Sequence, residues 1–249
     1  MQTTGNTILV TGGGSGIGRG MAEAFHHLGN QVIITGRRQA ALDEVTRANP
    51  GMAAYTLDIT DPAAISAFAA RVVADHPALN AVLNNAGIMV PEDIVGGDYL
   101  QTAEDTVATN LLGPIRLTSA LLPHLLAQPS ATVLTVSSGL AFVTMAATPT
   151  YSATKAAIHA YSQALRHQLR NTTILVIEIA PPYVQTTLMG DHQASDPHAM
   201  PLDEFLNETM DLLAGDPANG EVLVHRVHPL RFAERTGNGE AMFNMLNPR

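Results

Sequence analysis

Short apolar runs alternate with segments of helical periodicity along most of the chain. The apolar runs predict buried strands at 7–10, 31–35, 53–57, 79–83, 131–136, 173–179 and 221–224. The helical periodicity predicts helices at 17–28, 38–48, 61–74, 103–127 and 151–170. Strands that are apolar on both faces are typical of a parallel sheet covered by helices on both sides. The pattern therefore predicts an α/β fold built on a doubly wound parallel sheet of about seven strands.

Two local features refine this picture. Asp61 is placed to cap the helix that begins at Pro62. The stretch 186–202 is rich in Gly, Asp, His, Ser and Pro and follows the sixth strand, at the sheet edge where such folds bind ligands. We expect it to be a substrate lid loop, with an ordinary surface loop as the alternative.

No repeat or linker divides the sequence, so residues 1–249 are expected to form a single domain.

The composition narrows the class of partner. Apolar residues make up 46% of the chain and charged residues 14%, which is typical of a well-buried globular protein. The net charge of -9 argues against nucleic acid, because phosphate binding needs a basic face. Neither a membrane-spanning run nor a secretory signal is recognisable, so we expect a cytoplasmic protein with a small-molecule substrate. The absence of cysteine excludes disulfides and thiolate chemistry.

A glycine-rich turn follows the first strand and opens directly into a helix, in the run Thr11-Gly-Gly-Gly-Ser-Gly-Ile-Gly18. Glycines let the backbone approach a pyrophosphate closely, and the N-terminus of a helix offers N–H groups and partial positive charge. The spacing T-G-x-x-x-G-x-G differs from G-x-G-x-x-G and from a P-loop. In its strand–turn–helix context, the turn predicts dinucleotide binding and a Rossmann-type sheet.

The end of the second strand indicates which dinucleotide is bound. NAD sites usually place a carboxylate there to hold the ribose 2′-hydroxyl. This chain instead has Thr35-Gly-Arg-Arg38. Two guanidinium groups suit a 2′-phosphate, so Arg37 and Arg38 predict NADP(H) as cofactor. The alternative is a solvated pair of arginines at the sheet edge.

Lys155 is the one lysine in the sequence, and Tyr151 lies four residues before it. Residues four apart share a helix face, so the two side chains are expected to converge. A compact ammonium group stabilises an ionised phenol better than a planar guanidinium does. The pair therefore indicates a tyrosine that acts as a general acid or base.

Together these motifs resemble those of the short-chain dehydrogenase/reductase family over nearly the whole chain. The matching segments are Thr11–Gly18, Asp58–Ile59, Asn84–Gly87, Asn110, Ser138, Tyr151–Lys155 and Pro181–Thr186. Within the family, the chain is most similar to the branch named for D-alanine esterification of teichoic acids. That similarity lies in Ser137–Val143, Leu165–Arg170 and Glu178–Pro182.

The resemblance implies a division of labour among four catalytic residues. Tyr151 is expected to protonate the carbonyl oxygen, and Ser138, preferred over Ser137, to bind the same oxygen. Lys155, with the oxidised nicotinamide, is expected to lower the tyrosine pKa by about three units from its usual value near 10 and to bind the nicotinamide ribose. Asn110 is expected to hold a water that links Lys155 to solvent.

The resemblance also implies the residues that bind the cofactor. They are Thr11, Gly12, Gly14, Ser15, Gly16, Ile17, Gly18, Arg37, Arg38, Asp58, Ile59, Asn84, Ala86, Gly87, Tyr151, Lys155, Pro181, Val184 and Thr186. One departure from the family is Pro182, which stands where glycine is usual and is expected to stiffen the backbone facing the nicotinamide.

The predicted substrate pocket is apolar, which favours an uncharged ketone or aldehyde. Its expected residues are Met89, Leu140, Met145, Tyr183 and Met189. We expect no metal, because the histidines lack metal-binding spacing. The segments 103–127 and 151–170 lie where the family forms a helical seam between subunits, which implies a homodimer or homotetramer. The alternatives are a nucleotide-sugar epimerase or dehydratase and a non-catalytic NADP(H)-binding redox sensor.

Overall fold

A computed structural model, which describes residues 1–215 and 217–248, contains one seven-stranded sheet. All neighbouring strands are parallel, in the order β3-β2-β1-β4-β5-β6-β7. The strands are β1 (Thr7–Thr11), β2 (Gln31–Gly36), β3 (Ala53–Thr56), β4 (Leu79–Asn84), β5 (Ala131–Val136), β6 (Ile174–Ile179) and β7 (Glu221–Val222). The predicted doubly wound parallel sheet is confirmed.

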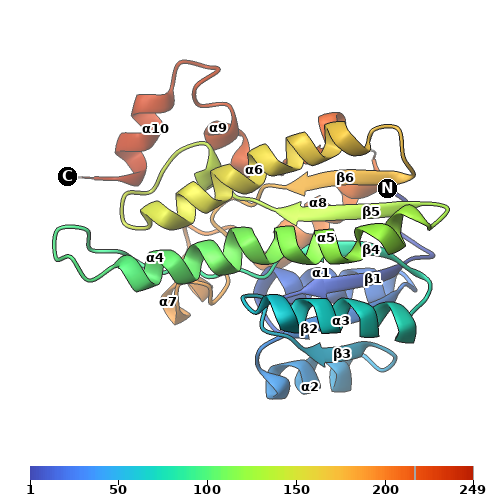
Figure 1. The fold of residues 1–249 in the computed structure, drawn as a ribbon. Helices are drawn as coiled ribbons and strands as arrows, with labels where there is room; N and C mark the ends of the chain where they lie inside the picture. The colour runs from blue at the N-terminus through green and yellow to red at the C-terminus, as the bar shows by residue number, and fades with distance from the viewer. Residues whose placement is uncertain (216, 249) are drawn as a thin grey trace.

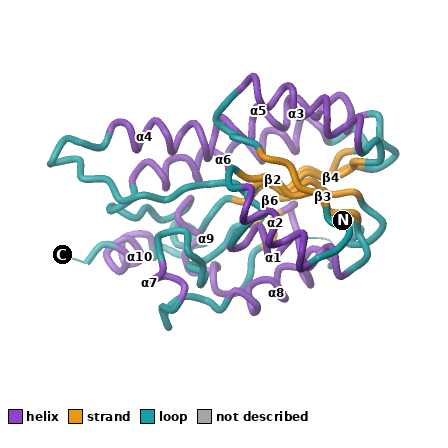
Figure 2. Tube along the Cα trace, turned by 90° about the horizontal axis from the view of Figure 1, so that it is seen from below, coloured by secondary structure: helices purple, strands orange, loops and turns teal. Residues whose placement is uncertain are grey.

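Helices form a layer on each side of the sheet (Figures 1 and 2). One layer consists of α1 (Gly16–His27), α2 (Gln39–Ala48) and α8 (Leu202–Ala214). The other consists of α3 (Pro62–Asp75), α4 (Leu100–Val107), α5 (Gly113–Leu126) and α6 (Pro149–Leu169). The short helices are α7 (Asp191–Ala194), α9 (His228–Arg231) and α10 (Gly239–Leu246), with single turns at η2 (Gly139–Ala141), η3 (Ala218–Gly220) and η4 (His225–Val227).

The alternation of side chains along the strands divides the core into two clusters. Ile8 and Val10 of β1 pack on the side of α1 and α8, in a cluster that includes Phe25 and Phe205. Leu9, between them in sequence, packs on the opposite side in the cluster of α3, α5 and α6. Successive side chains of a strand point to opposite faces, so a central strand buried on both faces must be apolar throughout.

The helix predicted at 103–127 is interrupted by a single π-helical turn, η1 (Ala108–Leu112), between α4 and α5. This turn was not predicted, because the apolar periodicity continues across it. The seventh strand, predicted at 221–224, is shorter, and the helices α7 to α10 were not predicted. Asp61 does cap α3: its carboxylate accepts hydrogen bonds from the N–H groups of Ala63 and Ala64.

The order of the strands places a crevice at one edge of the sheet. From β1 the chain goes to β2 and β3 on one side, and from β3 it crosses back to β4 on the other side of β1. Because the strand order reverses at β1, the connections that follow β1 and β4 lead to opposite sides. This leaves a crevice beyond the carboxyl ends of these two strands. Among the described residues, no helix is both long enough and apolar enough to cross a membrane.

Candidate active site

The turn between β1 and α1 brings main-chain N–H groups to the crevice. Gly12 and Gly16 have φ values of 68° and 53°, which favour glycine over other residues. A Cβ atom at Gly18 would clash with the carbonyl oxygen of Gly12, so the helix packs this closely only without a side chain there. Ser15 is the N-cap of α1, yet its side chain makes no capping hydrogen bond within the described structure. The N-terminus of α1 is thus open toward the crevice.

Thr11 ties the carboxyl ends of β1 and β4 together. Its hydroxyl donates to the Leu83 carbonyl (3.3 Å) and accepts from the N–H groups of Asn85 and Ala86 (both 3.0 Å). The Asn85 side chain returns a hydrogen bond to the Thr11 carbonyl (2.9 Å). These bonds fix the floor of the crevice. Asn84, predicted to contact the cofactor, is buried, and its amide donates to the Thr118 hydroxyl of α5 (3.1 Å).

Arg37 and Arg38 follow β2 and lie at one end of the crevice, near Asp58. The Asp58 carboxylate accepts hydrogen bonds from the N–H (2.9 Å) and hydroxyl (2.7 Å) of Thr60. These bonds, with the nearby charge of Arg37, hold the pKa of Asp58 below its usual value. The carboxylate is thereby committed to its own loop, which leaves both guanidinium groups for an anionic ligand.

Two adjoining cavities, of about 280 and 440 Å³, together form an elongated cleft. They share Gly12, Ser15, Arg37 and Arg38 in their walls, and the larger one extends to Tyr151 and Lys155. Such a cleft, with a basic end and an uncapped helix N-terminus at its middle, fits a dinucleotide. It includes the predicted residues Thr11, Gly12, Gly14, Ser15, Gly16, Ile17, Gly18, Arg37, Arg38, Asp58, Ile59, Ala86, Gly87, Met89, Ser138, Tyr151, Lys155, Pro181, Val184 and Thr186.

Tyr151 and Lys155 lie one turn apart on α6, and both side chains are buried. The Lys155 ammonium donates to the Val136 carbonyl at the end of β5 (2.8 Å) and stands 5.5 Å from the centre of the tyrosine ring. Burial lowers the pKa of Lys155 to about 8, although the negative charge of Glu178 partly offsets this. At neutral pH the lysine is still charged.

The pKa of Tyr151 departs from the expected direction. Burial raises it to about 12, against the opposing effect of the Ser138 side chain. Removal of the phenol from water therefore outweighs the stabilisation of the phenolate by the Ser138 side chain. The tyrosine is neutral across the physiological range, which is the form that donates a proton.

The two candidate serines at the end of β5 differ in their hydrogen bonds. Ser137 is buried, and its hydroxyl donates to the Ile179 carbonyl of β6 (3.4 Å). The Ser138 hydroxyl accepts from the Leu140 N–H (3.1 Å), which leaves its own proton for another acceptor, and it lies next to Tyr151. This geometry favours Ser138 over Ser137 as the residue that meets a substrate oxygen.

Asn110 lies in the π-helical turn η1. Its carboxamide oxygen accepts from the Ile88 N–H and its amide donates to the Ile88 carbonyl, both at 2.8 Å. A weaker contact of 3.4 Å reaches the Thr154 hydroxyl on α6. Asn110 thus joins the loop after β4 to the helix that carries Tyr151, from a position buried beside the cleft.

The segment 186–202 contributes Thr187, Leu188 and Gln193 to the walls of the cleft. The buried Gln193 side chain donates to the Val184 carbonyl (2.7 Å) and to the Thr186 hydroxyl (3.2 Å). Val184 also forms a parallel bridge with Met200. Gln193 was not predicted as a site residue. The sequence indicates it only as a long polar side chain within the predicted lid.

Of the five residues predicted to form the substrate pocket, Met89 lines the cleft. The other four, Leu140, Met145, Tyr183 and Met189, lie outside its walls. Tyr183 is 40% exposed, and its hydroxyl donates to Asp196 of the segment 186–202 (3.1 Å). The cleft walls also include Asn85, Ile88 and Val90, which were not predicted.

Comparison with known proteins agrees with this geometry. The model of the short chain dehydrogenase family matches residues 6–197. The uncharacterised oxidoreductase DltE of Bacillus subtilis is 38% identical over 99% of this chain and 98% of its own length.

Two solved structures show the same fold. A short chain dehydrogenase from Burkholderia cenocepacia, in complex with NADP, superposes with a TM-score of 0.85 at 22% identity, over 100% of both chains. One from Burkholderia phymatum, in complex with NAD, superposes with a TM-score of 0.82 at 19% identity, over 100% of this chain and 98% of its own. The glycine turn, the buried Tyr151–Lys155 pair and these matches lead to one conclusion: the chain belongs to the short-chain dehydrogenase/reductase family of oxidoreductases.

Proposed function

We propose that this protein is an NADP(H)-dependent reductase of ketones or aldehydes, with Tyr151 as the general acid. The observation that carries the proposal is the buried Tyr151–Lys155 pair, one turn apart on α6 in the wall of the cleft. With pKa values of about 12 for Tyr151 and about 8 for Lys155, a neutral phenol stands beside a charged ammonium at neutral pH. That is the combination needed to give a proton to a carbonyl oxygen as it becomes an alkoxide.

The nicotinamide dinucleotide, when bound, supplies the hydride in the direction of reduction. Ser138 then donates a hydrogen bond to the carbonyl oxygen, and Tyr151 transfers its proton to the same atom. Lys155 offsets the charge left on the phenol. Asn110, held by Ile88, positions the loop beside α6 through which solvent restores the proton.

The preference for NADP(H) rests on Arg37 and Arg38 at the adenosine end of the cleft. We expect NADPH to bind at least tenfold more tightly than NADH, as measured by quenching of intrinsic tyrosine fluorescence or by calorimetry. Arg37→Asp is expected to erase or reverse the preference, because a carboxylate repels the 2′-phosphate and accepts from a free ribose hydroxyl. Equal affinities of the wild type for the two cofactors would refute it.

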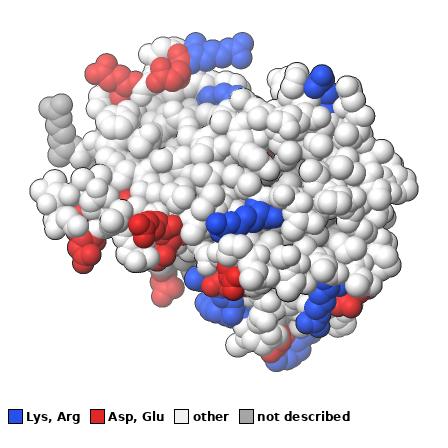
Figure 3. All heavy atoms as spheres, viewed as in Figure 1, with Lys and Arg blue, Asp and Glu red and all other residues white. Residues whose placement is uncertain are grey.

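We further propose that residues 1–249 act as one domain, that 186–202 is a substrate lid and that the protein is a homodimer or homotetramer. The lid proposal is supported by Leu188 and Gln193, which line the cleft. The oligomer proposal is supported by the face of α4, α5 and α6, where charges are isolated and wide areas are uncharged (Figure 3). Exposed Ala153, Ala160 and Ala164 lie on α6. Sedimentation as a monomer at micromolar concentration would contradict the oligomer.

The reaction is tested by NADPH oxidation with a panel of ketones and aldehydes, run with wild type and Tyr151→Phe. Loss of the acid is expected to reduce turnover at least hundredfold while NADPH binding is retained. Tight NADPH binding without turnover of any carbonyl compound would instead favour a redox sensor.

A further inference from the structure

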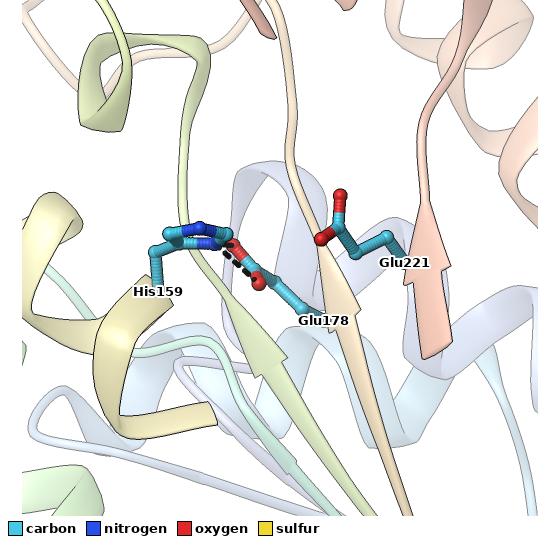
Figure 4. Close-up of side chains that lie close together, drawn as sticks. All are labelled: His159, Glu178 and Glu221. Carbon is cyan, nitrogen blue, oxygen red and sulfur yellow. Dashed lines mark hydrogen bonds and ion pairs between the residues drawn. The ribbon is translucent and has the colours of Figure 1, made fainter. Parts of the chain in front are cut away.

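The face of α6 that carries Tyr151 and Lys155 continues one turn further to His159, since residues four apart share a helix face. His159 points toward β6, where its Nδ1 atom lies 2.8 and 3.0 Å from the two carboxylate oxygens of Glu178 (Figure 4). Its other ring nitrogen lies 3.0 Å from the Gln163 amide. The reaction proposed above uses neither His159 nor Glu178.

Glu178 is a buried carboxylate, 1% exposed, near the carboxyl end of β6, the strand next to the edge strand β7. Its neighbour in register on β5 is Thr135, whose hydroxyl bonds to Ser162 of α6 (2.7 Å), so this face of the sheet lies under α6. Val136, the next residue of β5, accepts the hydrogen bond from Lys155. A buried carboxylate is costly unless cations compensate it, so its partners are expected to be specific.

Two carboxylates, Glu178 and Glu221, lie close to the one guanidinium group of Arg231. Glu221 of β7 is its register neighbour, and oxygens of both carboxylates and a nitrogen of His159 lie within 4.8 Å of one another (Figure 4). Arg231 of α9 binds Glu221 with two hydrogen bonds, of 2.9 and 3.1 Å. One guanidinium thus balances one carboxylate, and we interpret the cluster as an ion-pair network. The Glu178 carboxylate is hydrogen-bonded to His159 of α6, and its charge acts on Lys155 of the same helix.

We propose that Glu178, held by His159, is a positioning residue that keeps the Lys155 ammonium charged and so sets the alkaline limit of the reaction. The inference rests on the proposed function, in which a charged lysine stands beside Tyr151. The carboxylate acts through the lysine and does not touch the reacting atoms.

The electrostatics agree with this geometry. Burial alone drives the pKa of Lys155 downward, and the charge of Glu178 acts in the opposite direction. Without that carboxylate, the lysine would lose its proton closer to neutral pH, and a smaller fraction of it would be charged there. Arg231 also faces Glu178. The pKa of Arg231 is raised mainly by its hydrogen bonds to Glu221 and, to a smaller extent, by the charge of Glu178. Removal of Arg231 is therefore expected to act on Lys155 with the opposite sign.

The single lysine makes the test direct. Lysine labelled with carbon-13 at Cε gives one protein signal, and its chemical shift against pH reports the titration of Lys155 in the full chain, with no substrate required. We expect the Glu178→Gln midpoint to fall by about one pH unit and the Arg231→Gln midpoint to rise by several tenths. His159→Gln keeps a donor to Glu178 and is expected to move the midpoint by less than 0.3 units on the same scale. Asp75→Asn, at the end of α3, is the control for loss of a distant carboxylate.

Opposite shifts in Glu178→Gln and Arg231→Gln would support the proposal, because general loosening of the fold cannot move one lysine in two directions. Midpoints of both variants within about 0.3 units of wild type would overturn it. If Glu178→Gln does not fold, the sign of the Arg231→Gln shift decides alone. Where a carbonyl substrate is found, the alkaline limb of its pH–rate profile is expected to follow the same shifts. If the lysine midpoints shift as predicted but no carbonyl compound is turned over, the reductase proposal would be refuted. The proposed effect of Glu178 on Lys155 would still be supported.

Discussion

Replacement of Lys155 by methionine is expected to stabilise the fold near neutral pH while it abolishes catalysis. The ammonium is buried, and its pKa falls from 10.5 to about 8 in the folded protein. Below pH 8 the folded state therefore carries a charge that would be better solvated in the unfolded chain. The difference of about 2.5 units corresponds to about 3 kcal/mol. Methionine fills a similar volume without the charge.

The dependence on pH identifies the cause. Between pH 8 and 10.5 the unfolded wild type binds a proton at Lys155 that the folded protein does not, so wild-type stability rises with pH. The advantage of Lys155→Met should therefore shrink by about 2.5 kcal/mol between pH 7 and pH 10. The lost hydrogen bond to Val136 lowers the stability of the variant at every pH, so it does not alter this change.

Urea unfolding of both proteins at pH 7, 8, 9 and 10 measures the effect, and other titrating groups cancel in the difference. Tyr151→Phe is the matched control from the same helix, because a phenol with a pKa of about 12 stays neutral over most of this range. A stability difference between Lys155→Met and wild type that stays constant within about 0.5 kcal/mol would refute a depressed lysine pKa.

Three further outcomes are expected. Glu92→Ala should lower the free energy of unfolding by about 1–2 kcal/mol. The reason is that the Glu92 carboxylate accepts hydrogen bonds from the Thr150 N–H (3.1 Å) and hydroxyl (2.7 Å) at the start of α6. A urea unfolding curve unchanged from wild type would contradict this. Gly18→Ala should prevent NADPH binding without loss of circular dichroism, and retained affinity would show that the glycine turn adapts. Alcohol oxidation should rise with pH, since Tyr151 must first lose its proton; a flat profile from pH 6 to 10, with chemistry rate-limiting, would exclude Tyr151 as the base.

The sheet was predictable because its strands are apolar on both faces, a pattern that few other structures require. Six of the seven strands begin at the residue expected from the sequence, and β5 and β6 also end at the expected residue. The cleft was predictable for a related reason: the glycine turn, Arg37 and the Tyr151–Lys155 spacing are all local in sequence. Each needs only its own strand or helix to be placed correctly.

Features that depend on contacts between distant segments were not predictable. Glu178 appears in the sequence as one polar residue in an apolar strand, and nothing near it reveals His159 or Arg231 as partners. The hydrogen bond between the Tyr183 hydroxyl and Asp196 likewise joins segments whose contact no local pattern reveals. The direction of the Tyr151 pKa also depends on burial, which motif spacing does not encode.

The π-helical turn at Ala108–Leu112 makes the length of this segment a functional property. A π turn holds one residue more than an α-helical turn, and removal of one residue would restore a regular and intrinsically more favourable helix. The same deletion would rotate Asn110 by about 100° relative to α5 and turn its carboxamide away from Ile88. Insertions and deletions among related chains should therefore be rare here, even where the residues themselves vary. A redesign that idealises this helix would gain regularity and lose the site.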